Sequence, residues 1–239
     1  MSQIEESKKK KRIPRRIKLL IAAALFLLLL VVIPLCFIGA MLFDPPQTFK
    51  PPAVTDDIMF RNSQILTKVA AKTYKSKPGQ VAEITLTPDD VNALLVAAQN
   101  SDDYANVFLG KKSSPGKIKY KAHYDKGVFH VTLVKNTKIK TPFGSYVKVK
   151  VAATPEVTKN KEIIKIHSAT VGKFSLSPDK VEKRAEQELE KRKDNKYFKR
   201  AREIIISAKV NEDHSITITY YPNKLGRQVL GKVMMNVLK

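Results

Sequence analysis

The amino-acid sequence predicts an α+β protein in which an N-terminal transmembrane helix precedes a folded domain with an antiparallel sheet. Three observations predict this fold class. Residues 19–43 carry no charged side chain, apolar and polar residues alternate from Lys117, and Pro-Asp pairs at Pro88 and Pro178 follow short apolar runs. Such alternation is typical of half-buried strands, and proline followed by an acidic residue is typical of a helix start. We expect a basic cytoplasmic tail at 1–18, a membrane helix at 19–43, a proline-rich spacer at 44–55 and an extracytoplasmic α+β domain at 56–239.

The uncharged segment 19–43 is long enough to cross a membrane. A helix rises about 1.5 Å per residue, so this segment exceeds the roughly 30 Å of a hydrocarbon core. A cleaved signal peptide is the alternative, but its apolar region is usually only about 7 to 15 residues long. Cys36 follows Leu35, where a bacterial lipoprotein box requires a small residue. The segment therefore indicates a signal-anchor in a single-pass membrane protein.

The distribution of charge predicts which side of the membrane the domain occupies. The chain has a net charge of +22, and eight of its 44 basic residues lie within the first 18. Basic residues beside a span stay in the cytoplasm, so the C-terminal domain lies outside the cell membrane. The remaining surplus of basic residues attracts phosphate-bearing partners. This location excludes nucleic acid and leaves anionic lipid or an acidic polymer of the cell envelope.

The periodicity of apolar residues predicts a regular order of elements after the spacer. Thr87 and Pro88 have the side chains of a helix N-terminus, since the hydroxyl accepts a backbone N–H and proline suits the first turn. Four adjacent antiparallel strands follow. We expect helices at 56–74, 87–98, 179–203 and from Leu225 to the end, and strands at 81–86, 117–124, 128–134, 146–153, 162–174, 204–210 and 215–221.

Two segments ninety residues apart share a strand-to-helix pattern. Residues 84–91 and 174–181 agree at six of eight positions when Ser and Thr are counted as equivalent. One interpretation is that both are ordinary capped helix starts, and the other is a duplicated α+β half. The sequence leaves both interpretations open.

Lysines at alternate positions of the predicted sheet are the candidate binding residues. Alternate residues of a strand point to the same face, so these lysines gather on one side of the sheet. A solvated face that resists aggregation and an anion-binding face both fit this pattern. The anion-facing candidates are Lys117, Lys119, Lys121, Lys138, Lys140, Lys148 and Lys150, and Lys135 belongs to the same set of strands.

Motifs of known catalytic or metal chemistry are absent from the sequence. The chain has no glycine-rich phosphate loop, no Cys-x-x-Cys pair and no His-Glu-x-x-His. Aligning the apolar faces of the first two sheet strands places His123 opposite His130, close enough to share a metal ion. A third ligand is missing, however, and Lys119 and Lys121 on that face repel a cation. We therefore predict no enzymatic activity, no metal site and no cofactor.

The segment 86–95 resembles a known group of proteins. It reads Leu-Thr-Pro-Asp-Asp-Val-Asn-Ala-Leu-Leu and precedes a strand meander, a late helix and a closing strand. The YpmS-like and YceB-like groups of small membrane-anchored bacterial envelope proteins begin with a similar Leu-Thr-x-x-x-x-Asn signal, here Leu86, Thr87 and Asn92. The resemblance implies a tubular lipid-binding fold, in which a strongly bent antiparallel sheet packs against a long helix beside an apolar groove. The very charged helix at 179–203 and the added amphipathic C-terminal helix depart from that pattern.

These observations predict a membrane-anchored, non-enzymatic envelope protein whose basic outer domain binds anionic lipid or cell-envelope polymer. An accessory subunit that binds another membrane protein through its helices or span is the alternative. An envelope hydrolase is a third function class, and it requires polar residues clustered in a pocket.

Overall fold

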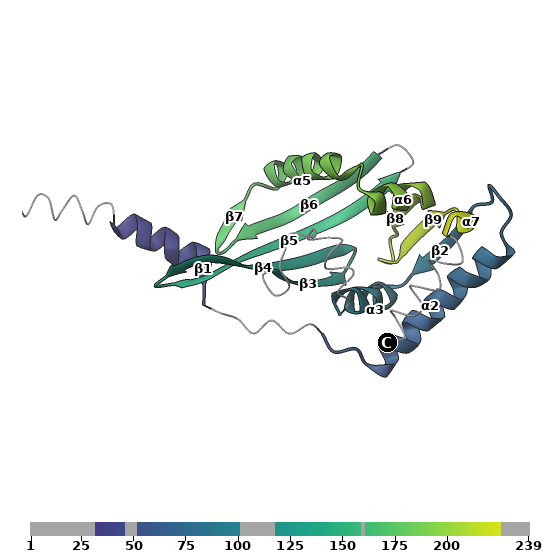
Figure 1. Ribbon diagram of the computed structural model, residues 1–239, viewed down its shortest axis with the longest axis horizontal. Helices are drawn as coiled ribbons and strands as arrows, with labels where there is room; N and C mark the ends of the chain where they lie inside the picture. The colour runs from purple at the N-terminus through teal and green to yellow at the C-terminus, as the bar shows by residue number, and fades with distance from the viewer. Residues whose placement is uncertain (1–31, 46–51, 101–117, 159–160, 226–239) are drawn as a thin grey trace, which may run out of the picture. The chain divides into compact units, whose positions relative to one another are not determined.

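A computed structural model describes residues 32–45, 52–100, 118–158 and 161–225 (Figure 1). The chain divides into two compact units, residues 1–41 and 42–239. Residues 32–42 are helical, and residues 19–31 of the expected membrane helix lie outside the described ranges. Within the described residues, no helix combines the length and the apolar character needed to cross a membrane.

The second unit has an α+β fold, as the sequence predicts. Nine strands in its described part form one open sheet in which every pairing is antiparallel. The strands are β1 (Phe43–Asp44), β2 (Ala82–Leu86), β3 (Ile118–Asp125), β4 (Val128–Thr141), β5 (Gly144–Thr158), β6 (Lys161–Val171), β7 (Phe174–Leu176), β8 (Ile205–Val210) and β9 (Ile216–Tyr220). The helices of this unit are α2 (Asp56–Lys75), α3 (Pro88–Gln99), α5 (Pro178–Arg192), α6 (Lys196–Ile204) and α7 (Pro222–Leu225).

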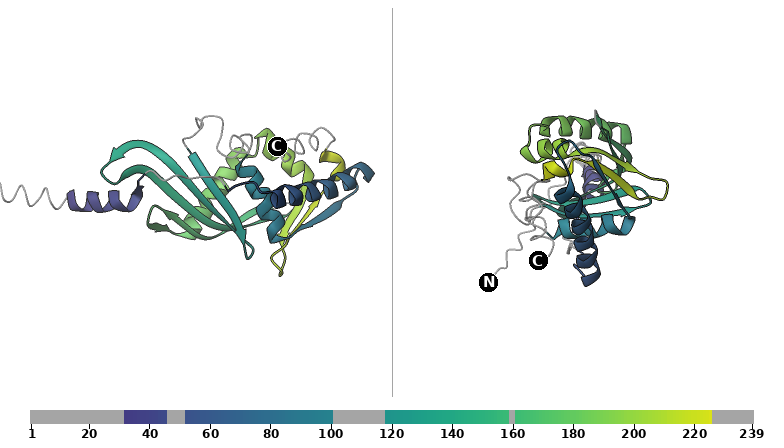
Figure 2. Two further views of the ribbon diagram at one scale, coloured as in Figure 1. Left: turned by 90° about the horizontal axis from the view of Figure 1, so that it is seen from below. Right: turned by 90° about the vertical axis from the view of Figure 1, so that its right-hand side faces the viewer.

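Strand β5 is the central element of the sheet. It pairs with β4 and β8 along one edge and with β1 and β6 along the other. Both β6 and β8 meet β5 at Val157, which requires that they lie on opposite sides of it. At about 3.4 Å per residue, β5 is roughly 50 Å long. Its start therefore carries β4 and β1, whereas its end carries β6 and the β8–β9–β2 part of the sheet (Figures 1 and 2).

The predicted meander of four antiparallel strands is confirmed as β3, β4, β5 and β6. The structure pairs them in chain order, and the strand predicted at 162–174 is divided into β6 and β7 by a turn at Gly172. Strands β4 and β5 extend beyond their predicted ends. Alternation of apolar and polar residues ends after Val134, and Pro155 argues against a strand. The sequence therefore predicts shorter strands than the β4 and β5 that the structure shows.

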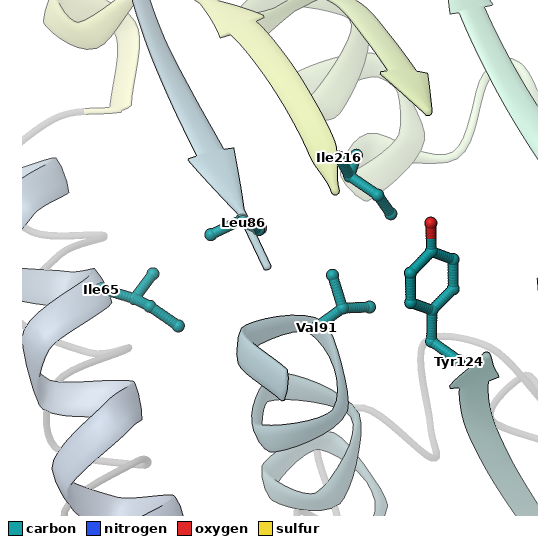
Figure 3. Packing of buried hydrophobic residues seen from close by; sticks show 5 residues of the cluster. All are labelled: Ile65, Leu86, Val91, Tyr124 and Ile216. Carbon is teal, nitrogen blue, oxygen red and sulfur yellow. The ribbon is translucent and has the colours of Figure 1, made fainter. Parts of the chain in front are cut away.

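The buried core lies between two helices and three strands. Ile65 of α2, Val91 of α3, Leu86 of β2, Ile216 of β9 and Tyr124 of β3 form one cluster (Figure 3). Both helices begin at or within one residue of their predicted starts. The Thr55 hydroxyl accepts from the backbone of α2, and Thr87 forms a reciprocal capping box with Asp90 at α3. The predicted helix starts are confirmed, and they set α2 and α3 against the β2–β9 pair.

Helix α3 also covers the open edge of β3. Asn92 Nδ2 donates to Tyr124 O at 2.9 Å, and Asn92 Oδ1 accepts from Tyr124 N at 2.7 Å. Two turns later, Gln99 makes the same pair of bonds with the backbone of Ala122, at 2.9 and 3.1 Å. Each amide side chain thus replaces a neighbouring strand, which stops another chain from pairing with this edge.

The prediction of one continuous charged helix at 179–203 is wrong, because the structure has two helices there. Helix α5 ends at Arg192 and α6 begins at Lys196. The break contains Asp194 and Asn195, whose side chains compete for backbone hydrogen bonds and favour helix ends. Helix α5 contacts β6, and its apolar residues Val181, Ala185 and Leu189 are half-buried. The predicted helix after Leu225 lies outside the described residues.

The two similar strand-to-helix segments fold alike but differ in their caps. β2 leads into α3, and β7 leads into α5. The Thr87 side chain accepts a hydrogen bond from α3, whereas the Ser177 side chain makes no cap bond to α5. The pattern therefore predicts the local structure at both places.

The folded unit begins earlier in the chain than the sequence indicates. Phe43 and Asp44, expected at the end of the span and the start of the spacer, form β1 and pair with Val147 and Tyr146 of β5. The chain is thus joined to the sheet immediately after the helix at 32–42.

Replacing Asn92 with alanine tests the edge cover. The substitution leaves the half-buried N–H and C=O of Tyr124 without partners, so we expect the free energy of unfolding to fall by about 1–3 kcal/mol. This loss occurs although alanine is the better helix former. Urea denaturation of the full chain in detergent, followed by circular dichroism, measures it. Gln64→Ala at an exposed site of α2 is the control, and its free energy of unfolding should change by no more than about 0.5 kcal/mol. Equal losses of stability in the two variants would contradict the role of Asn92 in covering the edge of β3.

Candidate functional site

The meander has one apolar face and one mainly polar face, although the buried Val134 and Ala152 lie on the polar side. Ala122 of β3, Val131 of β4, Val151 of β5, Ala169 of β6 and Leu176 of β7 are successive cross-strand neighbours on the apolar face. Ala122 and Ala169 are buried, and Val131 and Val151 are half-buried. Because helix α5 contacts β6, where the apolar side chains are the buried ones, α5 packs on this face.

The opposite face carries a row of polar side chains across five strands. Lys121 of β3 pairs with Thr132 of β4, which pairs with Lys150 of β5; the row continues through Thr170 of β6 to Ser175 of β7. Lys121, Lys150 and Ser175 are exposed, and the two threonines are half-buried. This set is the polar row, and none of its five members is acidic.

The spacing within the polar row suits an anion. Lys121 and Lys150 are separated by one strand, so their backbones lie about 10 Å apart, or two strand spacings. Flexible lysine side chains on both sides of the Thr132 hydroxyl are able to converge on one phosphate or carboxylate. This arrangement supplies positive charge and a hydroxyl donor on one face.

The predicted anion-facing lysines divide into two groups. Lys148 and Lys150 lie on the polar face of β5, with Lys121 on the same face of β3. Lys138 and Lys140 lie apart from them, where the pairing of β4 and β5 shifts register between Asn136 and Thr141. Lys135 is exposed on the other face, opposite Val147. Lys119 pairs through its backbone with Val134, and Lys117 lies outside the described residues.

The predicted opposition of two histidines on the polar face is confirmed. His123 pairs with His130, and their rings stack with centroids 4.8 Å apart and an interplanar angle of 12°. Desolvation, together with the charges of His130 and Lys121, lowers the pKa of His123. In the described part of the chain, no group of three His, Cys, Asp or Glu side chains is arranged to hold a metal ion.

A bulge in β6 interrupts the polar face beside this pair. Ala152 pairs with Ser168 and Ala153 with Ile166, which leaves His167 as the extra residue. The Ile166 N–H donates to Glu182 of α5 at 3.3 Å, and His167 Nε2 is 2.8 Å from Thr154 Oγ1. The carboxylate therefore satisfies a backbone group near the bulge, and helix α5 is attached to the sheet there.

An ion cluster joins the N-terminal ends of α2 and α3. Arg61 lies 3.2 Å from Asp57, 3.5 Å from Asp89 and 3.9 Å from Asp90. The hydrogen bond and charge of Asp57 raise the pKa of Arg61. Because the carboxylates also lie in the first turns of two helices, where acidic residues are favourable, helix packing accounts for this cluster.

A cavity of about 420 Å³ lies between the end of α2 and the start of β2. Lys72 and Lys75 line it, but Lys72 Nζ also donates to the backbone oxygen of Glu83. Lysines in the last turn of a helix interact favourably with its unpaired carbonyl groups. This cavity is remote in the strand order from the polar row, because β9 and β8 separate β2 from β5.

Comparison of the chain with protein-family models, curated proteins and solved structures finds no match. The candidate site therefore depends on the geometry of this chain alone.

Sequence reasoning missed the hydroxyl members of the polar row. Thr132, Thr170 and Ser175 become neighbours of the lysines only through the register of five strands. The alternation within each strand was the available signal, but the bulge at His167 and the turn at Gly172 obscured the alignment of β6 and β7.

Replacing His130 with threonine tests the electrostatics of the polar face. The substitution removes one of the causes that lower the pKa of His123, so this pKa rises but stays below its ordinary value of about 6.5. A nuclear magnetic resonance titration of the His123 Cε1 proton measures the change. Because the unfolded chain binds more protons below about pH 6.5, stability falls as the pH falls through this range, and less so in His130→Thr.

Raising the salt concentration is the control for that titration. Salt screens the charges of His130 and Lys121 but leaves the desolvation of His123 in place. A His123 pKa that is not lowered in the wild type, or that ignores the substitution, would contradict the stacked arrangement.

Proposed function

We propose that this protein is a membrane-anchored, non-enzymatic binding module. Its folded unit engages anionic lipid headgroups or an acidic envelope polymer through the polar row. The observation that carries the proposal is the placement of Lys121 and Lys150 on either side of Thr132 on one exposed face. Two ammonium groups and a hydroxyl form a site for a phosphate or carboxylate, and such groups repeat along polymers and lipid surfaces.

The segment 19–43 supplies the anchor in this proposal, and its basic flank keeps the N-terminus in the cytoplasm. The folded unit then works outside the membrane, where its surplus of basic residues attracts anionic surfaces over a distance of about one Debye length. Anchoring confines the unit to the membrane and raises its local concentration near partners there. Weak individual contacts are therefore sufficient for function.

The two-faced meander also supports the tubular lipid-binding comparison. Half-buried apolar side chains cover one face, and α5 packs along part of it. In this proposal the apolar face is the wall of a groove and α5 is its long helix. The break between α5 and α6 shortens that helix relative to the pattern that the resemblance implies.

Reversing the charge of the polar row tests the proposed function. We expect the full chain, held in zwitterionic nanodiscs, to bind liposomes containing phosphatidylglycerol or immobilised polyphosphate, with affinity that falls as salt rises. Lys121→Glu with Lys150→Glu should weaken this binding by about tenfold or more, from roughly 1 kcal/mol for each basic residue at an anionic surface. Titration by light scattering or biolayer interferometry gives the affinity.

The matched control reverses two lysines of α5 instead. Lys180 and Lys183 are exposed on a helix that packs on the other face, so Lys180→Glu with Lys183→Glu changes the net charge equally. The control should retain most of the binding. If both variants lose binding equally, only net charge matters and the polar row is not the site; if the wild type binds neither probe, the proposed function fails.

An accessory subunit of another membrane protein is the second candidate function. Ile33, Leu35 and Phe37 in the helix at 32–42 are 62%, 61% and 63% exposed, as in a helix that contacts lipid or another helix. This candidate is favoured if a defined protein co-purifies in detergent and is lost when residues 19–43 are exchanged for an unrelated span.

A further inference from the structure

The register shift between β4 and β5 produces a projecting segment next to β1. Asn136 pairs with Tyr146 and Thr141 with Gly144, so residues 137–140 of β4 lie opposite a single residue of β5. The four β4 residues must bulge outward from the ladder. Together with the turn at Pro142 and Phe143 they form the β4–β5 tip, residues 137–143.

Hydrogen bonds hold the β4–β5 tip in shape. Lys138 has a left-handed backbone conformation, with φ of 63°, and its N–H donates to Asn136 Oδ1 at 2.9 Å. The Thr137 hydroxyl donates to Ser145 O at 3.0 Å, and the Thr141 hydroxyl donates to Gly144 O at 2.6 Å. The projection is therefore built by side chains of the tip and its base.

The exposed residues of the tip combine one large apolar side chain with two charges. Ile139 is 60% exposed, and Lys138 and Lys140 on either side of it are exposed. A single exposed isoleucine is common on protein surfaces and carries no meaning by itself. Here the two neighbouring lysines and the position of the tip in the fold make the exposed Ile139 informative.

Strand β1 lies near the base of the β4–β5 tip. Phe43 and Asp44 pair with Val147 and Tyr146, the residues of β5 that follow the tip. Gly144 permits this close seam, because a Cβ atom there would lie 2.1 Å from the backbone oxygen of Asp44. The point at which the chain enters the folded unit is therefore fixed beside the tip.

We infer that the β4–β5 tip docks on the surface of the bilayer that holds the anchor. Ile139 enters the headgroup region, and Lys138 and Lys140 bind anionic headgroups. The inference rests on the proposed membrane span, since a span that ends at Phe43 brings β1 and the adjacent tip to the membrane surface. Basic residues near an anionic leaflet and an apolar side chain between them suit that interface.

A depth measurement in nanodiscs tests this inference on the full chain. In a Cys36→Ser background, Ile139→Cys carries an environment-sensitive fluorophore, and the nanodiscs contain phosphatidylglycerol and a lipid with a quencher near its headgroup. We expect a blue-shifted, quenched signal from position 139. Val81→Cys is the control, because Val81 is 47% exposed beside β2, in the part of the sheet that joins β5 at Val157. Its label should remain unquenched.

Native Cys36, the only cysteine of the chain, separates failure of the inference from failure of the anchor. If a label on Cys36 is quenched but the label at 139 is not, the docking inference is overturned while the anchor stands. If the label on Cys36 is not quenched, the proposed anchor fails and the inference with it. Equal quenching at positions 81 and 139 overturns the orientation inferred for the sheet.

Charge reversal tests the contribution of the two lysines. Lys138→Glu with Lys140→Glu should remove most of the quenching at position 139 in anionic nanodiscs, whereas Lys180→Glu with Lys183→Glu should leave it unchanged. Retained quenching in the tip variant would overturn the assignment of these lysines to anionic headgroups.

Discussion

The pairing of β5 with four strands is the constraint on which the folded unit depends. Its first residues carry the β4 hairpin on one side and β1 on the other, and its last residues carry β8 and β6. A single long strand thus connects the entry of the chain with the α2–α3 core.

The local structure was largely predictable from the sequence. Apolar periodicity located α2, the cap at Thr87 and Pro88 located α3, and alternation located β3 and the start of β4, including the opposition of His123 and His130. These features depend on neighbours in the chain, which pattern analysis detects. The role of β1 was not predictable, because two residues carry no periodicity and Asp44 precedes a pair of prolines that indicate a spacer.

The candidate site was predictable only in part, because patterns within one segment do not give the register between strands. Alternation placed Lys121, Lys148 and Lys150 on one face, but it also grouped Lys138 and Lys140 with them. The shift in register between Asn136 and Thr141 moves these two lysines to the tip, and such a shift depends on pairing rather than on composition. The hydroxyl groups of Thr132 and Thr170 join the lysines through cross-strand neighbours that no single segment reveals.

Two separate basic features follow from this architecture. The polar row lies on the polar face of the meander, and the β4–β5 tip lies at the start of β5, near β1. In the proposed arrangement, the anchored unit holds one end against the membrane and presents its polar face to a second anionic partner. The helix α5 packs on the opposite, apolar face.

Hydrogen–deuterium exchange of the full chain tests most directly whether the start of β5 faces the membrane. The exchange rates are compared between detergent and nanodiscs that contain phosphatidylglycerol. The account predicts slower exchange at residues 137–144 in nanodiscs, with no change in the turn at residues 211–214 between β8 and β9. Equal slowing in both segments, or slowing in neither, would contradict it.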